Sequence, residues 1–474
     1  MLIPDRAYGM EIEYGCILKS LGRVLPLSEW PADFLSGYLF RRADRQAGVM
    51  PTHARFWCAN GSLTYIDQGH PEHAAPEARF VRDAVIYSQA GDRIIADIFG
   101  ETTDDGKLEI MLFRNNIARE NEETLVTYGC HENYLAYGLT PYSVSGAQEA
   151  KGELFLSPFL ITRQILDGTG YWDDDGTFFL SQRARILGSK SDGVSVPYHI
   201  AVGVKYEGYT PRIHLVYGDS NMLDVATFLK LGTASLMLAL MEEKELPEIS
   251  MHFPLRELGL IARFGPMERV ICLVNGDKVS AHQIQTIYWE AARCLISESR
   301  FQSDETEAEM KLVLTLWEDA LNAIEHNDIN WMLGRIDWAT KRWLVDRELI
   351  KRRRADSSVH AGIRGDICLM YHHINNSASL QKRMHTFWRD KRMATDREIV
   401  YAMNRPPQGT RAQYRSAVIR AAIDGHMCGL TVDWHHAVVQ GTNGYHTFEM
   451  HRPLDDYKSA QHCVDGAMRS CWEH

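Results

Sequence analysis

The chain has 474 residues, of which 45% are hydrophobic and 24% are charged, the balance of an ordinary globular protein. This length predicts two or three domains or one large enzyme domain, and the net charge of −11 argues against nucleic-acid binding through a basic surface. Nine cysteines without a CxxC pair argue against a disulfide framework or a zinc ribbon.

The first residues contain no apolar signal region, and the longest uncharged apolar run, 231–241, is about half the length of a membrane span. The unpatterned cysteines are typical of reduced thiols. The sequence therefore predicts a cytoplasmic protein without a nucleic-acid or membrane partner.

The first predicted strand covers residues 9–15 and alternates apolar and acidic side chains. The apolar residues lie on one face, and Glu11 and Glu13 lie on the other. Neighbouring carboxylates repel each other unless a cation or a water-filled cleft lies over them. A cation site and a solvated edge strand are the two interpretations of this pattern.

A second strand is predicted at residues 63–67, with Tyr65 and Asp67 on one face. A turn at residues 68–69 then returns a second acid, Glu72, toward the first. Two acids and a phenol within eight residues are suited to metal binding and acid/base chemistry. A solvated hairpin with satisfied polar ends is the alternative.

Further elements follow from hydrophobic periodicity and from capping residues. Helices are predicted at residues 27–45, 76–98 and 154–168, through the run 231–241, and after an N-cap at Ser303. Strands are predicted at residues 108–116 and 213–216, and polar turns at residues 128–134 and 218–222.

Two further patterns indicate what a helix contacts. After Ser303, one apolar stripe predicts contact with the core and consists of Val313, Trp317, Ala320, Leu321 and Ile324. A basic cluster is either a solvated helix face or a docking surface for an acidic partner, and it consists of Lys341, Arg342, Arg347 and residues 351–354.

A change of composition near residue 405 predicts a first domain over 1–393 and a small C-terminal domain over 394–474.

Ten motifs along the chain resemble those of one family, the ligase of the prokaryotic ubiquitin-like protein Pup and its sister, the Pup deamidase. They are GMEIEYG (9–15), NGSLTYIDQGHPEHAAPE (60–77), FRNN (113–116), YGCHENYL (128–135), LSQRA (180–184), IHLVYGDSNM (213–222), FLKLGTASL (228–236), IDW..K (336–341), PPQGTRAQYR (406–415) and TVDW (431–434). Each motif is weak alone, but ten in the family's order are specific. The last 40 residues match poorly.

The resemblance implies an α+β fold related to glutamine synthetase and other carboxylate-amine ligases. In this fold a curved, largely antiparallel sheet forms a cradle, helices pack behind it, and a small C-terminal domain lies beside the ATP site. The polar strand faces predicted above would then line the cradle.

The implied chemistry explains the acids. A carboxylate does not react with an amine in water because its leaving group is oxide, and phosphorylation by ATP removes this obstacle. The site needs divalent cations at the phosphates and a base for the attacking ammonium. By motif position, the resemblance implies ATP and Mg²⁺ as cofactors, with Glu11, Tyr65 and Glu72 as metal ligands and Asp67 as general base.

The resemblance also implies nucleotide contacts. Arg212 and His214 occupy alternating positions of a strand, so both side chains can face the cleft. Arg411 and Arg415 are candidates for neutralising the γ-phosphate through bidentate guanidinium contacts, and Trp434 falls where the family stacks an aromatic residue on adenine. Additional ligands or phosphate contacts are expected from Glu13, His131 and Glu132.

The implied reaction joins the C-terminal glutamate side chain of a small disordered Pup-like modifier to a lysine of a target protein. The alternatives are hydrolysis of the modifier's amide or isopeptide bond, a diverged ligase for another carboxylate, and a non-enzymatic nucleotide-binding regulator. Deamidases of the family carry a long inserted loop after the first strand, and only 44 residues separate Gly15 from Asn60 here, which favours the ligase.

Other features point away from a typical ligase. The spacing from Asp67 to Glu72 and the following Ala-Pro-Glu are more like those of the deamidase. The family's arginine two residues before the tyrosine is replaced by Leu63, so one nucleotide contact is missing or replaced. An Arg-Asp-Glu-Pro-His segment of the family is not found in residues 196–212, which leaves a different modifier or acceptor open.

Overall fold

The computed structural model describes residues 2–25, 30, 34–37, 55–100, 108–119, 125–138, 156–187, 200–203, 212–353, 356–375, 380–423, 430–441 and 444–454. Most of the helix predicted at residues 27–45 lies outside this part, although residues 34–37 are helical. Most of residues 196–212 also lies outside the described ranges.

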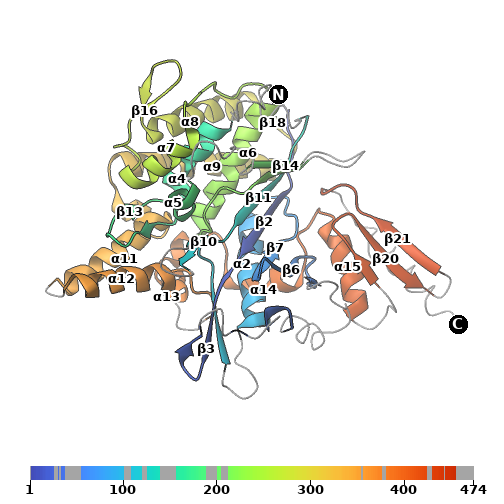
Figure 1. Ribbon diagram of the computed structural model, residues 1–474. Helices are drawn as coiled ribbons and strands as arrows, with labels where there is room; N and C mark the ends of the chain where they lie inside the picture. Colours follow the sequence, from blue (N-terminus) through green and yellow to red (C-terminus); the bar gives the residue numbers. More distant parts are fainter. Residues whose placement is uncertain are drawn as a thin grey trace.

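A seven-stranded sheet runs through the middle of the molecule (Figure 1). Its strands are β2 (Tyr8–Glu13), β5 (Arg55–Trp57), β6 (Leu63–Asp67), β7 (His70–Ala74), β11 (Cys130–Leu135), β14 (Ile200–Gly203) and β15 (Arg212–Leu215). Their order is β14-β15-β11-β2-β7-β6-β5, and each neighbouring pair is antiparallel. The predicted antiparallel sheet is therefore confirmed.

Smaller sheets surround this central one. A three-stranded sheet consists of β3 (Gly15–Ser20), β4 (Arg23–Val24) and β8 (Leu108–Phe113), and a second one of β19 (Leu430–Val432), β20 (His436–Gly441) and β21 (Gly444–Glu449). The paired short strands are β1 (Leu2–Ile3) with β18 (Arg300–Phe301), β9 (Ile117–Arg119) with β10 (Leu125–Thr127), β12 (Tyr171–Trp172) with β13 (Phe178–Phe179), and β16 (Ile271–Cys272) with β17 (Lys278–Val279).

Helices cover one face of the central sheet and extend beyond it (Figure 1). The described helices are α2 (Val81–Phe99), α4 (Ser157–Asp167), α5 (Gln182–Leu187), α6 (Asp224–Glu242), α7 (Pro254–Phe264), α8 (Ala281–Glu298), α9 (Asp304–Glu325), α10 (Ile329–Met332), α11 (Asp337–Lys351), α12 (Ser357–Met370), α13 (Leu380–Phe387), α14 (Asp396–Asn404) and α15 (Ala412–Ile423).

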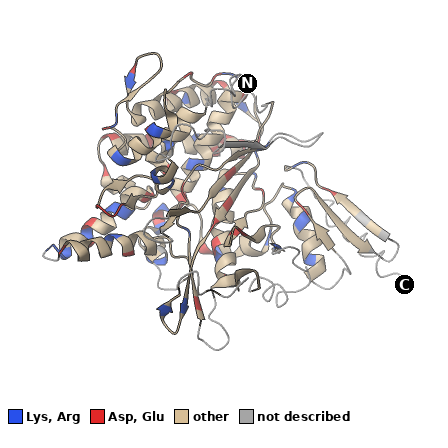
Figure 2. Cartoon of the chain, in the orientation of Figure 1, with Lys and Arg blue, Asp and Glu red and all other residues tan. Residues whose placement is uncertain are grey.

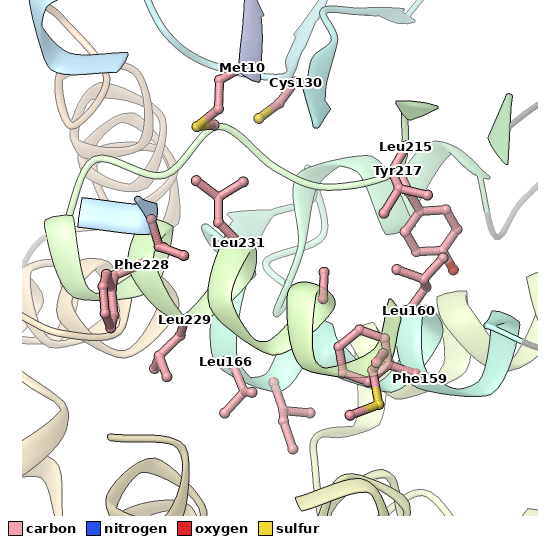
Figure 3. Close-up of a cluster of buried hydrophobic side chains, with 14 of the residues drawn as sticks. Met10, Cys130, Phe159, Leu160, Leu166, Leu215, Tyr217, Phe228, Leu229 and Leu231 are labelled. Atoms are coloured by element: carbon pink, nitrogen blue, oxygen red, sulfur yellow. The ribbon is translucent and has the colours of Figure 1, made fainter. Parts of the chain in front are cut away.

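The main core lies between the sheet and these helices. Side chains of β2 and β11 such as Met10 and Cys130 meet α4 and α6, where Phe159 and Phe228 are fully buried (Figure 3). Because strand side chains alternate, burying this face of β2 leaves the glutamates of the strand on the other face. The predicted division of β2 into an apolar and an acidic face is confirmed.

Helix α6 is long and apolar enough to cross a membrane by length and composition alone. Its apolar window is entirely buried inside the protein, as in a core helix. The run at residues 231–241 therefore forms a core helix, as predicted. Helix α9 also follows the prediction, because the Ser303 side chain accepts a hydrogen bond from the backbone N–H of Thr306 and the apolar stripe is buried.

Helix α2 begins five residues later than predicted, at Val81 rather than at residue 76. The intervening chain continues along the sheet, because the backbone N–H and C=O of Ala78 both bond to Tyr8. A pair of backbone hydrogen bonds here replaces the helical ones that propensity alone suggests.

The predicted polar turn at residues 128–134 is wrong. Residues 130–135 form β11, which lies next to β2 in the sheet. The error has a physical cause: Glu132 is fully buried and pairs with Arg163 of α4, at 2.6 Å between Oε1 and a guanidinium nitrogen. Because the charged Glu132 lies on the core face, residues 130–135 do not show the alternation of apolar and polar residues that identifies a strand.

The interpretation of the basic cluster as a solvated helix face is wrong for one member. Lys341 of α11 is fully buried, and its Nζ donates to the carbonyl of Gly170 at 2.8 Å and to Nε2 of His372 at 2.9 Å. Arg342 and Arg347 are exposed on the same helix. A docking surface on α11 would therefore exclude Lys341.

The last part of the chain packs in two places. Helix α14 contacts α2 through a small apolar cluster that includes Ile399 and Tyr87. Helix α15 and the β19–β21 sheet share another cluster, which includes Val418 and Val439. The domain boundary at residue 394 stays a prediction.

Candidate active site

The site is built on the open face of the sheet, opposite the core. Directly paired residues of antiparallel strands place their side chains on the same face. Tyr65 pairs with Glu72, Glu72 pairs with Glu13, and His131 pairs with Glu11. The register thus gathers acids from β2 and β7, a phenol from β6 and an imidazole from β11. Figure 2 shows acidic residues on these central strands.

The hairpin of β6 and β7 fixes part of this arrangement. Its two-residue turn has positive φ angles at both positions, 45° at Gln68 and 88° at Gly69. Such turns match the twist of the strands that they join. The predicted turn is therefore confirmed, and it places Tyr65 directly opposite Glu72.

Glu11 is held by hydrogen bonds on both carboxylate oxygens. Nδ2 of Asn133 donates to Oε1 at 3.0 Å, and Nδ1 of His131 lies 3.3 Å from Oε2. Burial favours the neutral acid, but His131, His214 and Arg212 overcome it and lower the pKa of Glu11 to about 2. Glu11 is therefore a carboxylate at neutral pH.

Glu13 has a similar set of partners. It accepts a hydrogen bond from the backbone N–H of Gly129 at 2.5 Å, and Nε2 of His70 lies 3.2 Å from its Oε2. Burial acts against the charged form, but the bonds from His70 and Gly129 lower the pKa of Glu13 below its usual value. Glu13 is therefore a second side chain that is a carboxylate at neutral pH, and it lies two residues from Glu11.

Glu72 has the opposite shift. Burial and the neighbouring Glu11 and Glu13 carboxylates raise its pKa to about 7, despite its hydrogen bond with Tyr65. Burial and the Glu72 and Glu11 carboxylates also raise the pKa of Tyr65 above its usual value. Three acids crowded on one face need a cation to ionise together, and their oxygen atoms are the ligands that Mg²⁺ prefers. The residues present therefore fit a magnesium site.

Two groups of side chains have metal-ligand spacing within the described residues. Ligand atoms of Glu13, Glu72 and His131 lie within 4.8 Å of one another, and so do those of Glu11, His131 and His214. The three predicted ligands Glu11, Tyr65 and Glu72 share the face. Glu11 belongs to one group and Glu72 to the other, and Tyr65 lies opposite Glu72 in the sheet.

Asp67 ends β6, two residues beyond Tyr65 and on the same face. Its side chain is half-buried, and Oδ2 accepts a hydrogen bond from the neighbouring Gln68 amide at 3.3 Å. Its charge contributes to the raised pKa of Tyr65, which places it near the acidic cluster. A base in this position combines access to solvent with closeness to the metal ligands.

Arg212 and His214 come from β15, at the far side of β11. Both contact Oδ1 of Asn133, the Arg212 guanidinium at 2.9 Å and His214 Nδ1 at 2.8 Å. Burial, despite Glu11, lowers the pKa of His214 to about 4, so this imidazole is neutral at physiological pH. The structure therefore brings both predicted nucleotide contacts to the edge of the acidic cluster.

Arg411 and Arg415 of the C-terminal segment share one acid, Glu77. Nε of Arg411 lies 2.7 Å from Oε1, and a terminal nitrogen of Arg415 lies 2.5 Å from Oε2. Burial would raise the pKa of Glu77, but the two guanidinium groups hold it at about 2. Both arginines thus have an anionic partner within the protein, before any phosphate arrives.

Trp434 lies beside the same group. Its ring meets Trp57 edge-on at a centroid distance of 5.1 Å, and the Arg415 guanidinium lies 4.5 Å from its ring centroid. Trp434 and Tyr65 pack on one apolar cluster that includes Leu63. The C-terminal aromatic is therefore next to the strand that carries the phenol, and Leu63 is buried in this apolar cluster.

Sequence reasoning erred for one residue and gave too little weight to others. Glu132 is not a site residue, because its carboxylate is buried in the core with Arg163. His70 and Asn133 contact the acidic cluster and were assigned no role. Recognising residues 130–135 as a strand would have placed His131 and Asn133 on the face of Glu11.

Comparisons with known proteins identify the family of the chain. The family model described as Pup-ligase protein matches residues 6–438. A Pup–protein ligase of Acidimicrobium ferrooxidans is 31% identical over 454 residues, which cover 92% of each chain. A Pup–protein ligase of Kineococcus radiotolerans is 31% identical over 452 residues, covering 91% of this chain and 92% of the relative.

Two solved structures share the fold. The crystal structure of the complex between Pup and its ligase PafA matches with a TM-score of 0.84 and 26% identity, covering 99% of this chain and 93% of that one. The structure of the Pup ligase PafA in complex with ADP matches with a TM-score of 0.76 and 27% identity, covering 95% and 96%. The predicted α+β fold is confirmed, and the chain belongs to the Pup-ligase family.

Proposed function

We propose that this protein is an ATP-dependent ligase that joins the C-terminal glutamate side chain of a Pup-like modifier to a lysine of a target protein. The observation that carries the proposal is the group of carboxylates on the open sheet face, with Asp67 beside it, in a chain of the Pup-ligase family. We also propose that the protein acts in the cytoplasm, because its unpatterned cysteines are typical of reduced thiols.

The site residues have separate roles in this proposal. Glu11, Tyr65 and Glu72 would hold Mg²⁺, and Glu13 and His131 extend this ligand set. Bound Mg²⁺ screens the phosphate charges and makes the γ-phosphate a better acceptor for the modifier carboxylate.

Nucleotide and lysine would be handled by neighbouring groups. Arg212, His214 and Arg411 would contact the phosphates, and Trp434 would stack on the base. Asp67 would take the proton from the lysine ammonium, so that the free amine attacks the acyl phosphate and phosphate leaves. Atoms balance as one ATP is converted to ADP and phosphate for each isopeptide bond.

The test is to mix the protein with ATP, Mg²⁺, a Pup-type modifier that ends in glutamate and a lysine-bearing acceptor. We expect a conjugate with the summed mass of the two proteins less one water, and one ADP for each bond formed. Hydrolysis of a modifier that ends in glutamine, without stoichiometric ADP release, would instead identify a deamidase. Because Leu63 and residues 196–212 differ from the family's pattern, the assay should include more than one modifier.

Glu72→Gln is expected to weaken Mg²⁺ binding by about tenfold or more, because the variant replaces a charged ligand with a neutral one. Isothermal titration with Mg²⁺ and a non-hydrolysable ATP analogue measures this change. Glu109→Gln serves as the control, since this glutamate is exposed on β8 away from the site. Equal affinity of the Glu72 variant and the unmodified protein would remove Glu72 from the ligand set.

Trp434→Ala is expected to raise the Kd for ATP by about 10–100-fold, because stacking of a base on an aromatic ring contributes about 1–3 kcal/mol. Trp434→Phe should recover most of the affinity, since the aromatic face remains. The exposed Phe387→Ala variant is the control. Affinity unchanged in Trp434→Ala would place the base elsewhere.

A further inference from the structure

We infer that Asn116 and Arg183 are positioning residues for the Glu13 carboxylate. Both act through one peptide group, which joins Tyr128 to Gly129 between β10 and β11. Asn116 follows β8 and Arg183 belongs to α5, so neither is one of the acidic strand residues on the open face. The inference deepens the proposed function and rests on it in one respect, which is that Glu13 extends the Mg²⁺ ligand set.

The N–H side of this peptide group faces Glu13. The Gly129 N–H donates to Oε2 of Glu13 at 2.5 Å, and the Gly129 carbonyl accepts from the backbone N–H of Glu13 at 3.1 Å. A Cβ atom on residue 129 would overlap Oε1 of Glu13 and Nε2 of His131. Only glycine therefore lets the backbone come this close to the carboxylate.

The carbonyl side of the same peptide group is held by two donors. Nδ2 of Asn116 donates to the Tyr128 carbonyl at 2.9 Å, and a terminal nitrogen of Arg183 donates to it at 3.1 Å. In a planar trans peptide group, the C=O and the N–H point in opposite directions. The two donors on the carbonyl therefore fix the direction in which the Gly129 N–H points.

The side-chain amide of Asn116 has one orientation that satisfies its neighbours. The backbone N–H of Ser220 can only donate, and its nitrogen lies 2.6 Å from the Asn116 amide oxygen. The amide nitrogen is then left for the Tyr128 carbonyl, which can only accept. Asn116 is fully buried, and its backbone carbonyl also accepts from the Tyr128 N–H at 3.1 Å. Asn116 thus holds both backbone groups of Tyr128.

Arg183 is fixed by its own partners. Its backbone N–H donates to Oδ1 of Asp219 at 2.9 Å, and its second terminal nitrogen donates to the carbonyl of Val216 at 2.8 Å. The side chain is 7% exposed. A planar guanidinium can hold two carbonyls in a fixed geometry, which a lysine ammonium reproduces poorly. Arg183 therefore ties the Tyr128 carbonyl to the chain that follows β15.

Tyr128 also supports the second hydrogen-bond partner of Glu13. The Tyr128 ring meets the His70 ring edge-on at a centroid distance of 5.3 Å, and Nε2 of His70 lies 3.2 Å from Oε2 of Glu13. A shift of Tyr128 would therefore disturb both contacts of Oε2. Residues that hold a metal-ligating group in this indirect way typically change metal affinity by about 10–100-fold when they are replaced.

The test measures Mg²⁺ affinity by isothermal titration of the full chain with a non-hydrolysable ATP analogue. Arg183→Met keeps an apolar stem and removes the donors, so it should weaken Mg²⁺ binding by about tenfold or more. In a Glu13→Gln background, the same substitution should weaken binding by no more than about twofold, because the carboxylate that it positions is already gone. Equal effects in both backgrounds, or unchanged affinity in folded Arg183→Met, would overturn the inference.

Further variants separate positioning from general stability. Arg185→Met is the matched control, because Arg185 lies in the same helix and pairs with Asp173 at 2.8 Å. It should leave Mg²⁺ affinity within about twofold of that of the unmodified protein. Arg183→Lys keeps the charge and should recover part of the affinity. Asn116→Asp replaces the Nδ2 donor by an oxygen, and it tests the same prediction if Arg183→Met does not fold.

A nuclear magnetic resonance measurement observes the peptide group directly, without metal or nucleotide. Carbon-13 in the tyrosine carbonyls and nitrogen-15 in glycine select the amide proton of Gly129, which should resonate downfield because it bonds to a carboxylate. This proton should move upfield in Arg183→Met and in Asn116→Asp, but not in Arg185→Met. An unshifted Gly129 proton in the folded variants would overturn the inference.

Failure of this inference can be told from failure of the proposed function. If no conjugate forms while the Gly129 proton responds as expected, the proposed function is contradicted and the positioning role stands. If Glu13→Gln leaves Mg²⁺ affinity unchanged, Glu13 is not a ligand, and the Gly129 proton alone decides whether Asn116 and Arg183 position it. Conjugation together with an unresponsive Gly129 proton would retain the ligase and remove the positioning role.

Discussion

Replacing Asp67 by asparagine is expected to lower the rate of isopeptide formation by about 10²–10⁴-fold, the usual contribution of a general base. The asparagine retains the size of the side chain but cannot take a proton from the lysine ammonium. Asp67 is half-buried at the end of β6, and its described hydrogen bond is to the adjacent Gln68. The substitution therefore removes the base without disturbing a buried network.

The measurement is the initial rate of conjugate formation with ATP, Mg²⁺, modifier and acceptor. Binding of Mg²⁺ and of an ATP analogue should stay within about twofold of that of the unmodified protein, since Asp67 belongs to neither metal-ligand group. Asp346→Asn is the matched control, because this aspartate is exposed on α11. Full conjugation by Asp67→Asn would assign the base to another residue.

Replacing Glu77 by glutamine should lower the free energy of unfolding by about 3–5 kcal/mol, the usual cost of removing one partner from a buried ion pair. The side chain of Glu77 is 12% exposed, and it neutralises Arg415, which is fully buried, and Arg411, which is nearly so. The variant leaves two guanidinium groups buried without their shared acid. Urea unfolding measures the change.

The effect should depend on pH with a defined sign. The Glu77 pKa is about 2 in the folded protein and is ordinarily 4.5, so its contribution is fully present above about pH 4.5. The difference between the unmodified protein and Glu77→Gln should shrink as the pH falls from 4.5 toward 2. Glu307→Gln, in an exposed pair with Lys311, should cost less than about 1 kcal/mol. A similarly small loss of unfolding free energy in Glu77→Gln would show that Arg411 and Arg415 do not need the Glu77 carboxylate for stability.

Local pattern was sufficient for much of the site. The alternation around Glu11 and the hairpin around Tyr65 gave the correct strands and faces, because each strand has one apolar side that must be buried. The sheet order was not visible in the sequence, since β11 and β15 reach β2 from distant parts of the chain. Family resemblance, rather than periodicity, supplied the antiparallel cradle.

Two of the errors share one cause. Glu132 and Lys341 are charged but fully buried, each with partners more than 30 residues away along the chain. A rule that places charges in solvent fails wherever a distant partner compensates the loss of hydration. No local signal distinguishes such a residue from a surface charge, which is why β11 was taken for a turn.

Strand β11 separates the core from the open face of the sheet. Glu132 points into the core, and His131 and Asn133 lie on the open face. Inactivating changes need not touch a reactant, since a substitution of Arg163 on the core side would leave Glu132 buried without its partner, in the strand that carries both polar groups. In a random mutagenesis screen for lost activity, α4 should therefore appear alongside the residues of the open face, and its variants should also have a lower free energy of unfolding.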